Sequence, residues 1–166
     1  HLTHDITPYN TFEVSYRLFQ TVEYWPEGTT FVSVVDPGVG SSRKSVVALT
    51  KTGQYIVTPD NGTLSYIKKV VGIEAVREIS EVENRRSNTE LSYTFHGRDV
   101  YAYTGAKLAS GHISFEEVGP ELPVDKILEL PVVETIIEDN LVRGAIDILD
   151  VRFGSLWTSI TRDDFY

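Results

Sequence analysis

Residues 30–40 read Thr30-Phe31-Val32-Ser33-Val34-Val35-Asp36-Pro37-Gly38-Val39-Gly40, an apolar run that stops at an aspartate and a glycine-rich turn. The β-branched residues from Thr30 to Val35 are typical of a buried strand. The glycines that follow permit tight turns and a close approach of the backbone to a ligand. The segment therefore predicts a core strand of an α/β sheet, with Asp36 at the strand end where such sheets carry ligand groups.

Periodic segments on both sides of this strand extend the prediction. A helix is expected to run to Val22 after a capping box, in which the Asn10 side chain caps the helix and Glu13 reaches back. Strands are expected over 45–49, 55–58 and 75–79, and helices over 63–71 and 98–110 with Gly111 as a left-handed cap. The polar residues 81–90 are predicted to form a surface loop. Alternating helices and strands indicate an α/β domain with a mostly parallel sheet.

The pattern changes after Gly119-Pro120. Residues 132–137 and 141–151 alternate like strands and show no helical period. We therefore predict an N-terminal α/β domain over 1–120, a linker over 121–131, and the opening strands of an all-β C-terminal domain over 132–166.

The composition excludes several classes of function. The net charge of −9, from 24 acidic and 15 basic residues, does not fit binding to a nucleic-acid backbone. With no cysteine the chain has neither disulfides nor thiolate metal sites, and His1 and His4 lack the carboxylates that a metal site needs. No apolar run approaches the ~20 residues that span a bilayer, and no secretion signal is visible. We expect no metal, no nucleic-acid partner, no membrane partner and a cytoplasmic location.

Three polar residues stand near glycines and could form a site. Asp36, Arg43 and His96 supply a carboxylate, a guanidinium and an imidazole. Taken singly, each has a simpler interpretation: an aspartate that opens a turn, a solvated cation and a polar residue at a helix start. A phosphate-binding loop is excluded, because Arg43 stands where that motif requires glycine before Lys44-Ser45.

Five motifs in order change this interpretation. They are Leu2-Thr3-His4-Asp5-Ile6-Thr7-Pro8-Tyr9, Asp36-Pro37-Gly38-Val39-Gly40-Ser41-Ser42-Arg43, Pro59-Asp60-Asn61-Gly62, Thr94-Phe95-His96-Gly97-Arg98-Asp99 and Asp150-Val151-Arg152-Phe153-Gly154-Ser155-Leu156-Trp157-Thr158. Together they resemble the S-adenosyl-L-methionine (SAM) hydrolases, also called SAM hydroxide adenosyltransferases, which are relatives of the SAM-dependent fluorinases and chlorinases. The resemblance covers nearly the whole chain.

The resemblance implies that Asp36, Arg43 and His96 form a triad that holds and activates a water molecule. That water would attack C5′ of SAM and give adenosine and L-methionine, with SAM as substrate and no cofactor. A histidine and a carboxylate are both plausible proton acceptors, so the acceptor is either Asp36 or His96.

The resemblance also implies substrate contacts from Tyr9, Asn61, Phe95, Asp150, Phe153 and Ser155. Tyr9 would stack on adenine, and Phe95 would line the pocket around the reacting carbon. Asp150 would hold the ammonium group of the methionine half through a charge-assisted hydrogen bond. Ser155 departs from the family pattern, which usually has asparagine there, and serine reaches less far than an amide.

The assembly implied by the resemblance is a homotrimer, with SAM between the α/β domain of one subunit and a barrel-like β domain of its neighbour. The chain contains no methionine, and the resemblance places His1 well inside the first domain, so we expect a fragment. Three alternatives remain open: a SAM-dependent halogenase, a SAM- or adenosine-binding module without turnover, and a methyltransferase. The triad disfavours the halogenase, and the lack of a glycine-rich loop after a first strand disfavours the methyltransferase.

Overall fold

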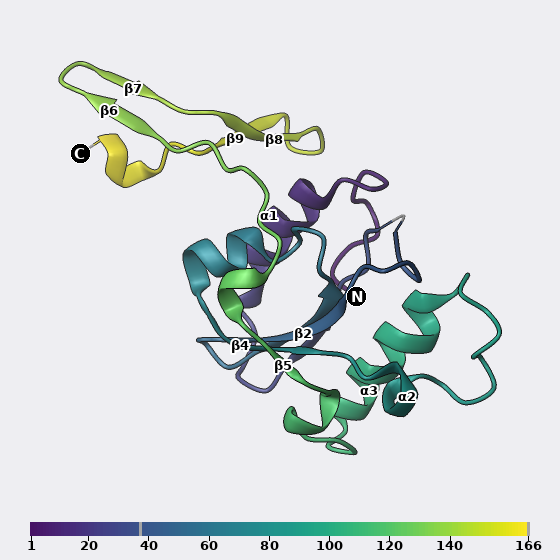
Figure 1. Cartoon of the computed structure of the whole chain (residues 1–166). Helices are drawn as coiled ribbons and strands as arrows, with labels where there is room; N and C mark the ends of the chain where they lie inside the picture. The colour runs from purple at the N-terminus through teal and green to yellow at the C-terminus, as the bar shows by residue number, and fades with distance from the viewer. Residues whose placement is uncertain (37, 166) are drawn as a thin grey trace. The chain divides into compact units, whose positions relative to one another are not determined.

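The computed structural model of the chain describes residues 1–36 and 38–165. The chain divides into two compact units, His1–Glu129 and Leu130–Tyr166, which are considered separately (Figure 1). The sequence predicts a linker over 121–131. In the structure Glu121–Leu122, at the start of this range, pairs with the sheet of the first unit, with Leu122 opposite Val76. The limits of the domains in the whole protein remain a prediction.

The first unit is built on a five-stranded sheet of order β1-β3-β2-β4-β5. Its strands are β1 Thr30–Val32, β2 Ser45–Thr50, β3 Tyr55–Pro59, β4 Ile73–Glu78 and β5 Glu121–Leu122. The predicted strands at 45–49, 55–58 and 75–79 are therefore confirmed. The predicted strand at 30–35 is regular only as far as Val32, although the Ser33 amide still donates to the Val57 carbonyl (2.9 Å).

The prediction of a mostly parallel sheet is wrong. In the described residues β1 and β3 run parallel, whereas β2 is antiparallel to β3 and to β4, and β4 is antiparallel to β5. The cause lies in the connection between β2 and β3, which consists of residues 51–54 with Gly53 at φ +87°. A parallel crossover needs about a dozen residues, so this connection can only form a hairpin. The fold is a mixed sheet with helices.

The helical segments are α1 Thr11–Val22, the π-helical η1 Ile67–Val71, α2 Glu81–Asn84, the π-helical η2 Gly97–Ala102 and α3 Tyr103–Ala109. Short 3₁₀ turns follow at Glu116–Val118, Val124–Lys126 and Arg162–Phe165. The helix predicted at 98–110 forms as η2 running into α3, with Gly111 at φ +71° after it. The prediction of a loop over 81–90 is wrong at its start, because α2 forms there and its buried Asn84 donates to the Val118 carbonyl (2.9 Å).

Apolar side chains cover both faces of the sheet. On one face Val46 and Ala48 belong to a cluster with Val14 and Leu18 of α1. On the other face Val47 and Val57 pack with Val100, Tyr101 and Leu108 of η2 and α3. Figure 1 shows α1 and α3 on opposite sides of the strands. Strands that are buried on both faces read as continuous apolar runs even when they are antiparallel, which is why the sequence suggested a parallel sheet.

The second unit contains two antiparallel two-stranded sheets. One pairs β6 Ile136–Glu138 with β7 Leu141–Arg143, and the other pairs β8 Ile146–Asp150 with β9 Ser155–Thr158. The strand-like character predicted for 132–137 and 141–151 is thus found as short paired strands.

Membrane-spanning helices are absent from the described part of the chain, since none of its helices combines the length and apolar character that a bilayer crossing requires.

The start of α1 supplies a test of the helix prediction. The Asn10 Oδ1 accepts a hydrogen bond from the Glu13 amide (3.0 Å), while the Glu13 side chain accepts from the Thr7 amide (3.1 Å). We expect Asn10→Ala to lower the free energy of unfolding by about 1 kcal/mol, because helix amides lose their acceptor. Asn10→Asp retains an acceptor and should lose much less. Urea unfolding compares the two, and equal losses would contradict the capping role.

Asp60 gives a prediction about pH. Its Oδ1 accepts from the Leu128 amide (3.0 Å), and burial raises the pKa of the carboxyl, opposed by this hydrogen bond and by nearby Arg43, Lys44 and Lys68. An acid whose pKa is raised on folding adds stability at low pH and loses it as pH rises through the folded-state pKa.

Asp60→Asn keeps an acceptor for Leu128 and removes the buried charge. It should therefore unfold at higher urea than the unsubstituted protein at pH 7, with the advantage shrinking as pH falls toward the ordinary aspartate value of 3.8. The same change at exposed Asp125 serves as control. An advantage that grows as the pH falls would contradict the prediction.

Candidate functional site

The polar residues predicted from the sequence gather at one edge of the sheet. The carboxyl ends of β1 and β3 share this edge with the start of β2, since Ser45 of β2 lies opposite Pro59 of β3. Two hydrogen bonds fasten the loops there: Asn61 Nδ2 donates to the Val35 carbonyl, and the Asp60 amide donates to the Lys44 carbonyl (both 2.9 Å). The edge therefore holds Asp36, which follows β1, against the segment that leads into β2.

Asp36 and Arg43 form an ion pair across this loop. Arg43 Nε lies 2.7 Å from Asp36 Oδ2, and the Gly38 amide donates to Asp36 Oδ1 (2.6 Å). The Asp36 side chain is 1% exposed and that of Arg43 is 33% exposed. Although Oδ2 and Nε are close, their alignment falls short of a hydrogen bond, and neither atom has another hydrogen-bond partner among the described residues. Both atoms are buried and face each other as an ion pair.

An added side chain would be crowded at two glycines of the loop. A Cβ on Gly38 would lie 2.9 Å from Arg43 Nε and 3.0 Å from Asp36 Oδ1. A Cβ on Gly40, which has φ +79°, would lie 3.1 Å from Cε1 of His96. The loop is thus in contact with the ion pair at Gly38 and with the imidazole at Gly40. Pro37, the first residue of the predicted Pro-Gly turn, lies outside the described residues.

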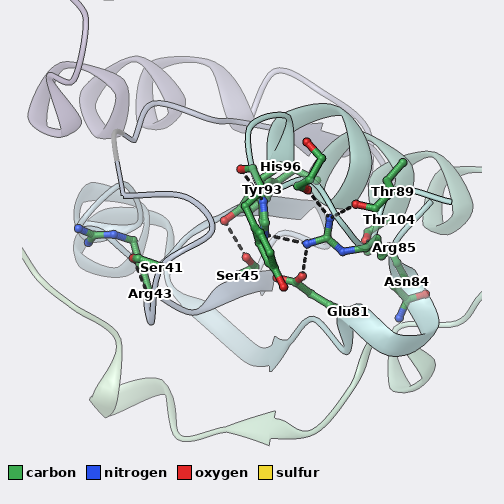
Figure 2. A network of polar contacts seen from close by, with 12 residues as sticks. Ser41, Arg43, Ser45, Glu81, Asn84, Arg85, Thr89, Tyr93, His96 and Thr104 are labelled. Carbon is green, nitrogen blue, oxygen red and sulfur yellow. Dashed lines mark hydrogen bonds and ion pairs between the residues drawn. The ribbon is translucent and has the colours of Figure 1, made fainter. Parts of the chain in front are cut away.

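His96 is buried on the far side of this loop, with 1% of its surface exposed. Its Nδ1 lies 3.2 Å from the Tyr93 carbonyl oxygen, and its Nε2 lies 3.0 Å from Arg85 Nη2 and 3.2 Å from Glu81 Oε1. Figure 2 shows Glu81, Arg85 and Tyr93 around the ring, with Arg43 apart from them.

The predicted triad is therefore brought together only in part. Asp36 and Arg43 pair directly. In the part of the chain that the structure describes, His96 makes no hydrogen bond or ion pair with either of them, and it reaches their loop through Gly40.

Sequence reasoning missed Glu81 and Arg85. Arg85 lies in the segment 81–90 that was predicted to be a surface loop, but its side chain is only 7% exposed, and its Nη2 pairs with Glu81 as well as with His96. Both residues follow β4, whose end lies at the same sheet edge because Glu78 is opposite Val46. The usable signal was their i, i+4 spacing, which places an acid and a base on one side of a helix.

Tyr101 is a further buried group at this edge. Its hydroxyl accepts a hydrogen bond from Ser45 Oγ (2.7 Å). Burial raises the pKa of Tyr101 to about 12, and the negative charges of Asp36 and Glu81 contribute to the rise. The hydroxyl is therefore protonated at neutral pH, and it lies near both the Asp36–Arg43 pair and the Glu81–Arg85 pair.

The other predicted residues of the first unit differ in their surroundings. Tyr9 is 67% exposed and has a φ of +67°, which is rare for a residue with a side chain and often marks functional sites. Phe95 is exposed beneath the guanidinium of Arg98, 4.7 Å from its ring centre. Asn61 is buried, and its Oδ1 accepts from the amide and the hydroxyl of Thr63. Both polar atoms of its side-chain amide therefore already have hydrogen-bond partners within the protein, since Nδ2 donates to the Val35 carbonyl. Substrate roles for these residues remain predictions.

Three predicted residues lie close together in the second unit. Asp150 ends β8 and Ser155 opens β9, and the two are paired across the strands. Asp150 is largely buried and its Oδ1 accepts from the Arg152 amide (3.3 Å), whereas Phe153 is exposed in the turn between the strands. A carboxylate beside an exposed aromatic is suited to a cationic or amphipathic ligand, and this role also remains a prediction.

Metal binding finds no support in the described residues, among which no group of three or more His, Cys, Asp or Glu side chains could hold an ion. A shallow hollow lined by Glu27, Lys51, Tyr55 and Glu74 lies beside the β2–β3 hairpin. That hairpin is at the opposite end of the strands from Asp36, because Thr30 pairs with Tyr55.

The chain is similar to proteins of known activity. The chain is 36% identical over 163 residues to the (R)-S-adenosyl-L-methionine hydrolase of Methanocaldococcus jannaschii, covering 98% of this chain and 54% of that protein. It is 35% identical over 172 residues to the enzyme of the same name from Thermus thermophilus, covering 97% and 62%. A fluorinase of Actinopolyspora mzabensis is 27% identical over 97% of this chain and 60% of that protein. The chain thus spans little more than half the length of these relatives.

Solved structures show the same fold. A crystal structure of an uncharacterised conserved protein from Thermotoga maritima superposes with a TM-score of 0.90 at 37% identity, covering 99% of this chain and 60% of that one. Residues 1–119 match the family model described as the SAM hydroxide adenosyltransferase N-terminal domain. This match takes in Asp36, Arg43 and His96 and most of the chain, so the chain belongs to the SAM hydroxide adenosyltransferase family.

Proposed function

We propose that this chain is part of an enzyme that hydrolyses S-adenosyl-L-methionine to adenosine and L-methionine. The observation that carries the proposal is the buried Asp36–Arg43 pair at the sheet edge, in which the carboxylate is held by the guanidinium and by the Gly38 amide. A carboxylate held in this way is suited to orient a water molecule that enters with the substrate. The similarity to two (R)-S-adenosyl-L-methionine hydrolases supports SAM as the substrate.

The proposed reaction is a substitution at carbon. The water oxygen forms a bond to C5′ while the C5′–S bond breaks, and the bonding electrons pass to sulfur, so that methionine leaves as a neutral thioether. The water gives up one proton, which is released to solvent in the end. Holding one water in line with the C5′–S bond contributes several kcal/mol by replacing a random encounter with a fixed geometry.

Asp36 is the better candidate for the group that accepts the proton. Both ring nitrogens of His96 already have partners, the Tyr93 carbonyl at Nδ1 and Arg85 with Glu81 at Nε2. Asp36 Oδ2 has no hydrogen bond, and its charge is balanced by Arg43. His96 would then act by supporting the loop through Gly40.

The remaining parts of the proposal concern the whole protein. Tyr9, Asn61 and Phe95 would contact the adenosine side of SAM, without any cofactor. From a barrel-like domain that begins after the linker near 121–131, Asp150, Phe153 and Ser155 would contact the substrate of a neighbouring subunit in a homotrimer. We place the enzyme in the cytoplasm. Support for the second set of contacts comes from the pairing of Asp150 with Ser155 beside exposed Phe153.

A SAM-dependent halogenase is the second candidate, favoured by the 27% identity to a fluorinase over 97% of this chain. The higher identity to two (R)-S-adenosyl-L-methionine hydrolases, 36% and 35%, argues against it.

The function can be tested on the whole protein with SAM in heavy-oxygen water that contains chloride and fluoride. We expect adenosine with heavy oxygen at C5′, detected by mass spectrometry. A 5′-halogenated nucleoside would establish the halogenase instead, and bound but unchanged SAM would indicate a binding module.

Asp36→Asn should lower kcat by a factor of about 100 or more, since it removes the proposed base. Exposed Asp125→Asn is the matched control and should keep full turnover.

The intersubunit site predicts complementation. Asp36→Asn and Asp150→Asn proteins should each turn over slowly, because each has one damaged half in every site. When the two variants are unfolded together and refolded as mixed trimers, roughly one site in four should combine two intact halves and regain activity. The Asp36→Asn protein refolded alone is the control. Mixed trimers that stay as inactive as the separate variants would contradict a site shared between subunits.

A further inference from the structure

The ring of His96 is held by a pair of opposite charges. Arg85 Nη2 lies 3.0 Å from Nε2, and Glu81 Oε1 lies 3.2 Å from the same nitrogen. Glu81 also pairs with Arg85 through its other oxygen, Oε2. Figure 2 shows the Arg85 guanidinium between the Glu81 carboxylate and the imidazole, with the Tyr93 ring alongside. One ring nitrogen therefore has both a permanent donor and an acceptor within reach.

The donor and acceptor chemistry fixes the tautomer. Arginine can only donate, so a neutral His96 must present the lone pair of Nε2 to Arg85. Nδ1 faces the Tyr93 carbonyl, which can only accept, so Nδ1 must carry the proton. If the ring gains a second proton, Nε2–H can donate to Glu81 without moving. Nδ1 thus keeps its proton in both states, and Arg85 and Glu81 share control of Nε2.

The surroundings hold the ring in place. Tyr93 stacks against it with ring centres 5.8 Å apart, and Arg85 lies over the Tyr93 ring. On the other side Gly40 is so close that a Cβ would come within 3.1 Å of His96 Cε1. The imidazole and the loop that carries Asp36 and Arg43 are therefore close neighbours at Gly40.

We propose that Glu81 and Arg85 are positioning residues: Arg85, which is held by Glu81, keeps His96 in the Nδ1–H tautomer, and the ring positions the loop that carries Asp36 and Arg43 through its close approach to Gly40. They would act without touching the substrate. The link to catalysis rests on the proposed hydrolysis of SAM, whereas the tautomer is a property of the protein that can be measured without substrate.

The first test measures the ring nitrogens of ¹⁵N-labelled whole protein by long-range ¹H–¹⁵N spectra at pH 8. We expect His96 to show a protonated Nδ1 and an unprotonated Nε2. Exposed His112, whose Nδ1 lies 2.9 Å from Ser110 Oγ, serves as an internal reference. A neutral His96 with its proton on Nε2 would overturn the proposal without any variant.

The second test replaces Arg85 by methionine, which fills similar space without a donor. Glu81 is then left facing Nε2, so Nε2 should become protonated while the His112 signals stay unchanged. Arg86→Met, the same change at the exposed neighbouring residue, should leave the His96 spectrum as it is. Glu81→Gln keeps Arg85 as donor, so Nε2 should stay unprotonated. An unchanged His96 spectrum in folded Arg85→Met would overturn the proposal.

Kinetics on the same proteins separates the two proposals. Where the unsubstituted protein hydrolyses SAM, Arg85→Met should lower kcat up to about 100-fold with a smaller change in KM, because the displaced loop misplaces the reacting groups. Arg86→Met should turn over normally. A changed tautomer with unchanged kcat would refute the positioning role while leaving the hydrolase intact. An unsubstituted protein that makes no adenosine would refute the hydrolase, and the tautomer would still be decided by the spectra.

Discussion

The loop between β1 and β2 is crowded at Gly38 and Gly40, next to the groups of the candidate site. A methyl group on Gly38 would press on both members of the Asp36–Arg43 pair, and one on Gly40 would press on His96. The loop therefore lies close to the ion pair at one glycine and to the buried imidazole at the other, although no hydrogen bond joins the two groups. The three residues of the predicted triad are therefore neighbours around one loop, although His96 makes no hydrogen bond or ion pair with Asp36 in the described part of the chain.

The mixed sheet is what brings these segments to one edge. In a sheet with one parallel pair and a hairpin, the ends of β1, β3 and β4 and the start of β2 coincide. Each of these points leads into a loop or a short helix with polar residues: Asp36 after β1, Asn61 after β3, Glu81 after β4 and Arg43 before β2. An all-parallel arrangement would have left the segment before β2 at the opposite edge, and Arg43 could not have reached Asp36.

The sequence predicted some of these features and not others, for physical reasons. Local signals were sufficient where the structure is local: Asn10 caps α1, Gly111 follows α3, and the β-branched runs form strands. The sheet direction was predicted wrongly because both strands are buried on both faces and read as the apolar runs of a parallel sheet, although the four residues between them fit only a hairpin. Asp36 and Arg43 were found because their motif is distinctive. Glu81 and Arg85 were missed because a charged run reads as solvated surface unless the contact with a buried histidine is known.

The balance of charge at the edge bears on how such a site would treat SAM. Asp36 is matched by Arg43, Glu81 is matched by Arg85, and Tyr101 stays protonated, so these groups together carry no net charge at neutral pH. A sulfonium substrate would gain little from them in the ground state. That is favourable for the proposed reaction, because the positive charge on sulfur disappears as the C5′–S bond breaks. An unpaired carboxylate would stabilise the substrate more than the transition state and so slow the step. On this argument Arg43 lets Asp36 bind water at the reacting centre without also holding the cation in place.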